Sequence, residues 1–261
     1  MKTMITRAAP PRTRRGAGND ALERDAAFAL AYMGLGLVGV AAGVTVWAGM
    51  GAWFVPKAIV VFGAASAFVW QALPTHAPHR RFGVANGITL FRLALVALLA
   101  AGVGEPALQS PVLSWCVVGL ATVGALLDAV DGAVARRRGQ ASAFGARFDM
   151  ETDALLIAAL SALVAALDKT GAWVLAAGAL RYAFVLAAVV WPWLAAPLPP
   201  SMRRRTVCVV QIVTLIVCLA PIVPPMWASV IAGAGLAALV YSFAADMVGL
   251  ARQRRSDVAS C

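Results

Sequence analysis

The sequence has few charged side chains for its length. Only 13% of its 261 residues are Asp, Glu, Lys or Arg, whereas 61% are hydrophobic. Soluble globular chains contain about a quarter charged residues and about half apolar residues. With so little polar surface available, the composition excludes an ordinary soluble domain and predicts a polytopic membrane protein.

Cysteine and histidine are also scarce. The 4 cysteines form no Cys-x-x-Cys pair, and the 2 histidines lie close together, at positions 76 and 79. Neither a disulfide framework nor a zinc site is expected from this spacing. We interpret the cysteines as small residues within apolar helices. We interpret His76 and His79 as solvated residues of a connector beside the membrane.

Long apolar runs fill most of the chain. About 20 residues span the hydrocarbon core as a helix. Eight runs have about this length, at 28–49, 53–73, 86–103, 112–134, 149–167, 172–191, 206–223 and 227–250. The predicted fold class is all-α, a polytopic transmembrane helical bundle. We divide it into a basic tail (1–27), two N-terminal transmembrane helices and a connector (28–81), a six-helix core (82–251) and a second tail (252–261).

Basic residues predict the sidedness of the bundle. With the N-terminus in the cytoplasm and alternating spans, 18 of the 22 Lys and Arg residues fall on the cytoplasmic side. Lys57 and Lys169 fall on the other side, whereas Arg92 and Arg181 lie within spans. The positive-inside rule therefore favours the inner (cytoplasmic) membrane, with both termini in the cytoplasm. It also explains the net charge of +10 without a nucleic-acid partner.

Four aspartates lie near the cytoplasmic ends of two consecutive expected spans. Asp128 and Asp131 are three residues apart and share one helix face, and Asp149 and Asp153 are four apart on the next helix. The basic connector at 136–147 makes these helices antiparallel neighbours, so the four carboxylates converge. Charges inside a span cost about 2.5–3.5 kcal/mol each, which marks them as functional. Divalent cations are their natural neutralisers, and oxygen ligands suit Mg²⁺ or Mn²⁺.

The residues between the aspartates fit a phosphate-containing substrate. Gly132 lets a bulky ligand approach the backbone, and Gly145 opens space one turn before Asp149. Arg136 lies just beyond Gly132, where its guanidinium can hold a diphosphate with two hydrogen bonds. Glu151 points to another helix face, so we leave it out of the metal site.

Together these residues read Asp128-x-x-Asp131-Gly132-x-x-Ala135-Arg136, followed after eight residues by Gly145-x-x-x-Asp149-x-x-x-Asp153. This pattern resembles the signature of the CDP-alcohol phosphotransferase family. The resemblance covers about residues 82–250. It implies a six-helix membrane enzyme, often dimeric, that transfers the phosphatidyl group from CDP-diacylglycerol to a small alcohol and releases CMP.

Roles follow from the resemblance for the matching positions. It implies two metal ions held by Asp128, Asp131 and Asp149. Asp153 is expected to act as general base on the acceptor hydroxyl and to touch a metal as well. The residues expected to bind CDP are Gly132, Arg136, Gly145 and Thr89.

Further residues point to the acceptor. Asn86-x-x-Thr89-x-x-Arg92 forms a polar stripe similar to the one that opens the first core helix of the family. Phosphatidylglycerophosphate synthases have an arginine in a place similar to Arg181, and lysines where Arg203 and Arg205 stand. Arg92, Arg181, Arg203 and Arg205 are therefore candidates for acceptor binding. The alternatives are a structural ion pair for Arg181 and a topology anchor for the arginine run at 203–205. As acceptor-binding residues, these arginines favour glycerol 3-phosphate, with inositol phosphate or another polar alcohol as the alternative.

A cation transporter is the competing class of function. Acidic residues continuing across the membrane would favour it, but the outer halves of the two aspartate-bearing spans carry no charge. The remaining charged residues are expected in solvated or interfacial positions, with Glu105, Asp168 and Lys169 in outer connectors and Asp246 near the inner end of the last span. The sequence therefore favours an enzyme of phospholipid synthesis.

Overall fold

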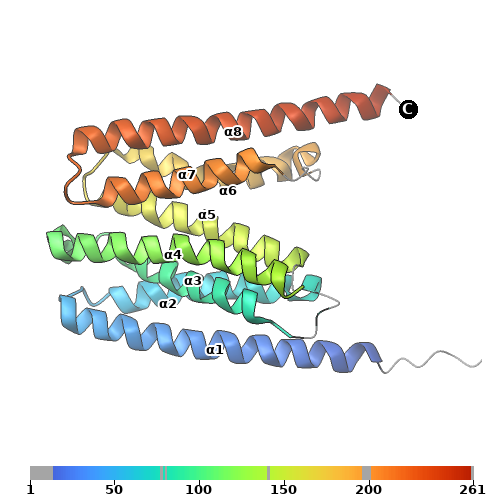
Figure 1. The fold of residues 1–261 in the computed structure, drawn as a ribbon, viewed down its shortest axis with the longest axis horizontal. Coiled ribbons are helices and arrows are strands. Elements are labelled where there is room, and N and C mark those ends of the chain that lie inside the picture. The colour runs from blue at the N-terminus through green and yellow to red at the C-terminus, as the bar shows by residue number, and fades with distance from the viewer. Residues whose placement is uncertain (1–13, 77–78, 80, 140–141, 196–200, 260–261) are drawn as a thin grey trace, which may run out of the picture.

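The computed structural model describes residues 14–76, 79, 81–139, 142–195 and 201–259. Within these residues the chain is all-α, as expected, and its eight α-helices run side by side (Figure 1). They are α1 (Arg14–Ala48), α2 (Phe54–Ala72), α3 (Val84–Ala101), α4 (Pro111–Arg137), α5 (Ala143–Ala166), α6 (Leu175–Val190), α7 (Met202–Leu219) and α8 (Pro225–Ala259). A short 3₁₀ helix, η1 (Leu73–His76), continues α2.

Six of the described helices are long and apolar enough to cross a membrane. They are α1, α2, α3, α4, α6 and α8, which makes the chain a multi-pass membrane protein. Eight spans were expected, and eight helices are present among the described residues, but α5 and α7 are not apolar enough to count as candidate spans. Charges explain the difference, because α5 carries four charged residues between 147 and 153 and α7 begins with three arginines at 203–205.

The two terminal helices extend beyond the expected spans. The first span was expected to begin at residue 28, but α1 already begins at Arg14. Residues 1–13 of the expected tail lie outside the described residues. At the other end, α8 continues to Ala259, through most of the expected C-terminal tail. The start of α1 and the end of α8 lie at the same end of the bundle (Figure 1).

Helix α3 occupies the centre of the fold. In its most apolar stretch 67% of the residues are buried, compared with 11% to 28% in the other five candidate spans. It packs against α1 and α2 on one side and against α4 and α5 on the other. The polar side chains Asn86, Thr89 and Arg92 of α3 are buried, and they can meet those of α4 and α5.

Helices α5 and α6 approach each other closely at Gly178. A Cβ atom added at this glycine would lie only 2.6 Å from the Cα of Ala158 on α5. Small residues at a helix interface allow such contact within a membrane. This contact holds the first half of α6 against α5, the helix that carries two of the four aspartates.

Glu105 departs from the expectation of a solvated outer connector. Only 6% of its surface is exposed. Its carboxylate accepts hydrogen bonds from the backbone N–H of Gly51 at 2.7 Å and from Lys57 Nζ at 2.6 Å. Lys57 Nζ also donates to the carbonyl oxygen of Val103 at 2.9 Å. These contacts tie the α1–α2 turn to the connector that follows α3, so Glu105 has a structural role.

Replacing Glu105 by glutamine should destabilise the protein at neutral pH. Burial alone would raise the pKa of this carboxyl, but the hydrogen bonds from Lys57 and Gly51 outweigh burial and lower it. Because the pKa is lower in the folded state than in the unfolded state, this stabilisation is present above the unfolded-state pKa and is lost as pH falls through the folded-state pKa. We expect the variant to lose about 1–3 kcal/mol of stability at neutral pH.

Thermal unfolding midpoints, recorded across acidic and neutral pH in detergent, check this prediction. The wild type should lose stability in acid more steeply than Glu105→Gln. Glu23→Gln is a matched control, because Glu23 is exposed on α1. Parallel pH curves for the wild type and Glu105→Gln would contradict the argument.

Candidate active site

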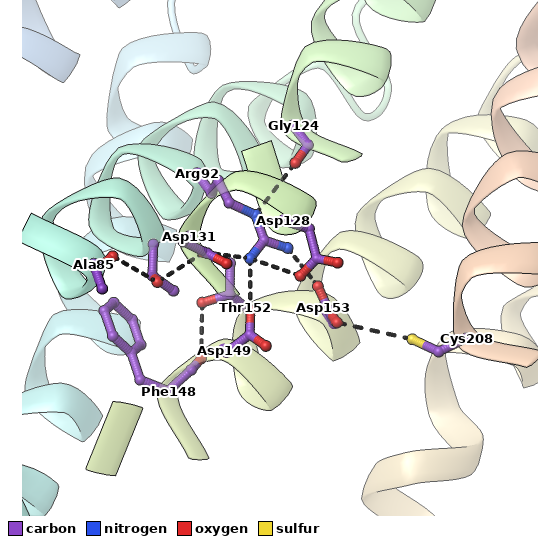
Figure 2. Close-up of polar contacts among 11 residues, drawn as sticks. Ala85, Arg92, Gly124, Asp128, Asp131, Phe148, Asp149, Thr152, Asp153 and Cys208 are labelled. Carbon is purple, nitrogen blue, oxygen red and sulfur yellow. Dashed lines mark hydrogen bonds and ion pairs between the residues drawn. The ribbon is translucent and has the colours of Figure 1, made fainter. Parts of the chain in front are cut away.

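The four aspartates converge in space. Asp128 and Asp131 lie near the C-terminal end of α4, and Asp149 and Asp153 lie near the N-terminal end of α5 (Figure 2). The spacing of three residues on α4 and four on α5 places each pair on one helix face. The connector between the helices turns these faces toward one another. The expected convergence of the carboxylates is therefore present in the structure.

Arg92 lies at the centre of this acidic cluster. Its Nη1 atom lies 3.1 Å from Asp128, 2.9 Å from Asp131 and 2.6 Å from Asp149. Its Nη2 atom donates to Asp153 Oδ1 at 2.5 Å. The side chain is 1% exposed. One guanidinium thus contacts all four carboxylates (Figure 2).

The backbone of α4 completes the environment of Arg92. The Nε–H of this side chain donates to the carbonyl oxygen of Gly124 at 3.2 Å. A buried charge is tolerated only when it is paired and its donors are used. Arg92 does not line the cavity described below, so its place differs from the expectation that it contacts the acceptor.

Thr89 belongs to the same network. Its hydroxyl lies 2.9 Å from Asp131 Oδ2 and 3.2 Å from the carbonyl oxygen of Ala85. A hydroxyl donates one hydrogen bond, and the carboxylate is the closer and more negative acceptor. Asn86, one turn earlier, donates from Nδ2 to the carbonyl oxygen of Phe82 at 2.6 Å. The polar stripe on α3 therefore faces the acidic cluster.

Three of the carboxylates could hold a metal ion. One oxygen from each of Asp128, Asp131 and Asp149 lies within 4.8 Å of the others. Such a set of carboxylate oxygens fits a hard divalent cation. Asp153 is not part of this set, although it was expected to touch a metal. Its Oδ2 atom lies 3.9 Å from Cys208 Sγ on α7.

A cavity of about 760 Å³ opens beside the cluster. Ten of the residues expected from the sequence line it, namely Thr89, Asp128, Asp131, Gly132, Arg136, Gly145, Asp149, Asp153, Arg181 and Arg205. Arg203 does not line it. The carboxylates come from α4 and α5, whereas Arg181 and Arg205 come from α6 and α7. The lining also includes Arg136 of α4 and Asp246 of α8, so carboxylates and guanidinium groups share the cavity.

Comparison with protein families decides the identity of this site. Residues 82–243 match the family model described as CDP-alcohol phosphatidyltransferase. The chain belongs to this family. Comparisons with curated proteins and with solved structures found no match. The matched range begins just before α3 and ends within α8, so it contains all four aspartates and leaves out α1 and α2.

Family membership gives the cluster its chemistry. The chain is a phospholipid-synthesis enzyme with CDP-alcohol phosphatidyltransferase activity, whose substrates are CDP-diacylglycerol and an alcohol. The aspartate cluster of this phosphatidyltransferase fits a metal site typical of the family.

Glu151 has a role that the sequence did not indicate. Its carboxylate pairs with the guanidinium of Arg181, on the part of α5 that faces α6. It is not one of the aspartate-cluster residues that could hold a metal ion in the phosphatidyltransferase, as expected, but it neutralises a cavity-lining arginine. No local pattern indicates this pair, because the two residues are thirty positions apart.

Asp246 also differs from its expected solvated or interfacial position. It is 8% exposed, and it lines the cavity from α8. Its Oδ1 atom lies 2.5 Å from Arg203 Nη2 and 3.5 Å from Arg204 Nη1. The arginine run of α7 is therefore anchored to α8 in the phosphatidyltransferase. This contact explains why Arg203 lies behind the cavity lining.

Proposed function

We propose that the enzyme transfers the phosphatidyl group of CDP-diacylglycerol to glycerol 3-phosphate and releases CMP. The observation that carries this proposal is a cavity lined both by the four aspartates and by Arg181, Arg204 and Arg205. A phosphorylated acceptor is a dianion, which needs cationic hydrogen-bond donors. Arg181, Arg204 and Arg205 line the cavity and carry such donors. Arg181 also pairs with Glu151, and Arg204 also pairs with Asp246.

The CDP group is assigned to the part of the cavity between α4 and α5. Asp128, Asp131 and Asp149 would hold the metal, which neutralises negative charge on the diphosphate when bound. Gly132 leaves room for Arg136, whose Nη1 atom lies 3.3 Å from the position that a Cβ at residue 132 would take. The Arg136 guanidinium can therefore fold over the backbone toward the diphosphate. Gly145 leaves similar room beside Asn86 Oδ1, at 3.0 Å.

Asp153 is assigned as the general base. Arg92 holds its Oδ1 atom, and its Oδ2 atom lies 3.9 Å from Sγ of Cys208, another residue of the cavity lining. This oxygen takes the proton of the acceptor hydroxyl as the hydroxyl oxygen attacks the phosphorus attached to diacylglycerol. A new P–O bond forms, and the anhydride P–O bond to CMP breaks, so CMP leaves with the bonding electron pair. Positioning of the two substrates supplies much of the rate enhancement.

We also propose that α5 and α7 cross the membrane, so that the chain has eight spans. Their 24 and 18 residues correspond to about 36 and 27 Å of helix at 1.5 Å per residue, which suits a hydrocarbon core of about 30 Å. Four of their charged residues line the cavity, namely Asp149, Asp153, Arg204 and Arg205. Glu151 and Arg203 are paired with Arg181 and Asp246. The arginines that flank α4, α5 and α7 lie at the aspartate end, which favours the cytoplasm for this end and for both termini.

Release of CMP from CDP-diacylglycerol, measured with purified protein and Mg²⁺ or Mn²⁺, tests the acceptor. Glycerol 3-phosphate should support release, whereas glycerol should not. The pair inositol phosphate and inositol makes the same comparison for the alternative acceptor. Release with inositol phosphate alone would replace glycerol 3-phosphate by that alternative, and release with unphosphorylated alcohols alone would exclude both.

A pair of variants tests whether Arg205 binds the acceptor. Arg205→Gln should raise the KM for the phosphorylated acceptor by about tenfold, the effect of about 1.4 kcal/mol of lost binding. Arg138→Gln is the matched control, because Arg138 is exposed at the end of α4 and does not line the cavity. Equal effects of the two substitutions would contradict the assignment.

A further inference from the structure

His76 is buried, although the sequence suggested a solvated connector. It ends η1, just after α2, and only 2% of its surface is exposed. Its ring packs edge-on against Phe144 of α5, with the ring centroids 5.1 Å apart. The residue lies before position 82, so it belongs to the part of the chain that the family model does not match. A buried imidazole in this place needs partners for both ring nitrogens.

Both nitrogens have partners. Nε2 lies 3.0 Å from the carbonyl oxygen of Arg81, and Nδ1 lies 2.9 Å from Ser142 Oγ. A carbonyl oxygen only accepts, so Nε2 carries a proton and donates. The groups that the ring meets are a hydroxyl, a carbonyl and aromatic rings, none of which is an anion. In the neutral ring Nδ1 then accepts, and the Ser142 hydroxyl donates its proton to His76.

Ser142 connects this histidine to the cavity. It is the N-cap of α5, and its Oγ atom accepts the backbone N–H of Gly145 at 3.0 Å. Ser142, Gly145 and Asp149 all line the cavity. Because Nδ1 of His76 accepts the hydrogen bond of the Ser142 hydroxyl, the lone pairs of Oγ remain available to Gly145 and to the cavity. The orientation of the first turn of α5 thus depends on a residue of the N-terminal helix pair.

We infer that His76 is a positioning residue for the nucleotide substrate. It fixes Ser142, and through Ser142 it fixes the first turn of α5, from which Gly145 and Asp149 face the cavity. This inference rests on the proposed assignment of that part of the cavity to the CDP group. It gives α1 and α2 a function beyond anchoring, because the end of this helix pair supports the substrate site from outside the residues that the family model matches.

Binding of CDP-diacylglycerol to the full-length protein, measured without acceptor and with Mn²⁺, tests the inference. His76→Phe keeps the aromatic packing but loses both hydrogen bonds, and it should raise the dissociation constant about fivefold to tenfold, the effect of one lost hydrogen bond. His76→Asn keeps an acceptor near the position of Nδ1 and should bind within about twofold of the wild type. The matched control is His79→Phe, since the His79 ring stacks on His76 at a centroid distance of 5.0 Å, and the backbone hydrogen bond from His79 N–H to the His76 carbonyl oxygen is kept.

A double-mutant cycle shows whether His76 acts through Ser142. In a Ser142→Ala background, His76→Phe should weaken binding no further, since the contact is already lost. If the losses of affinity of the two single variants multiply in the double variant, or if a folded His76→Phe protein binds normally, the inference about His76 is overturned and the proposed function is not. A wild type that does not bind CDP-diacylglycerol would overturn the proposed site as well. A wild type that binds but uses no phosphorylated acceptor would count against the acceptor only.

Discussion

Replacing Asp153 by asparagine should lower the rate of CMP release by about 10²–10⁴-fold, the usual contribution of a general base, while CDP-diacylglycerol still binds. Asparagine has nearly the same shape, but its amide cannot take the proton of the acceptor hydroxyl. Arg92 contacts Asp153 through Oδ1 only, and asparagine keeps an oxygen that can accept this hydrogen bond. The substitution therefore removes the base with little change in packing.

The measurement is kcat at saturating acceptor together with the dissociation constant of CDP-diacylglycerol. Asp168→Asn is a matched control, because it makes the same chemical change at an exposed residue just beyond the other end of α5. Asp168 has φ of 51°, a conformation that asparagine also tolerates. A kcat close to that of the wild type would refute the assignment of Asp153. If the dissociation constant of CDP-diacylglycerol rises while kcat is unchanged, Asp153 binds the substrate and is not the general base.

The acidic cluster could be predicted because its geometry is local. Spacings of three and four residues determine a helix face, and a short connector determines that α4 and α5 are antiparallel. These two facts bring Asp128 and Asp131 to Asp149 and Asp153 whatever the rest of the fold does. The same reasoning predicted a site at one end of the bundle, and the family model now covers these residues.

Contacts between distant helices could not be predicted in this way. The stripe of Asn86, Thr89 and Arg92 indicated one polar face of α3, but which neighbour this face meets depends on how the whole bundle packs. Arg92 was therefore expected at the acceptor, yet it pairs with all four aspartates. His76 and Glu105 are similar cases, because connectors show no periodicity from which burial can be read.

The length of the apolar segments predicted the helices, but it did not predict which helices are candidate membrane spans. Eight helices were expected and eight are present among the described residues, but two of them are too charged to count as spans by composition. In α5 and α7 the charged residues are those that the site needs, including Asp149, Asp153 and Arg205. The helices richest in functional residues are thus the ones whose composition least resembles a membrane span.

Replacing Arg92 by glutamine should strongly destabilise the protein when metal is removed. Among the described residues, Arg92 is the one cation that contacts all four aspartates, and its side chain is 1% exposed. Removing one partner of a buried charge network costs about 3–5 kcal/mol, because the remaining charges stay buried without compensation. The thermal unfolding midpoint in a chelator such as EDTA is therefore expected to fall well below that of the wild type. Arg92→Lys should lie between them, since a lysine ammonium has no planar fork to reach several carboxylates.

Adding Mg²⁺ or Mn²⁺ should then raise the midpoint of Arg92→Gln more than that of the wild type. The three carboxylates that could hold a metal ion are the same three that surround Arg92 Nη1. Two cations that neutralise one set of charges compete, so loss of the arginine leaves more of the metal's binding energy to appear as stability. Arg181→Gln is the matched control, because Arg181 pairs with Glu151 outside the cluster and should not change the response to metal. An equal response of all three proteins would contradict this competition, because it would mean that Arg92 and the metal stabilise the protein independently.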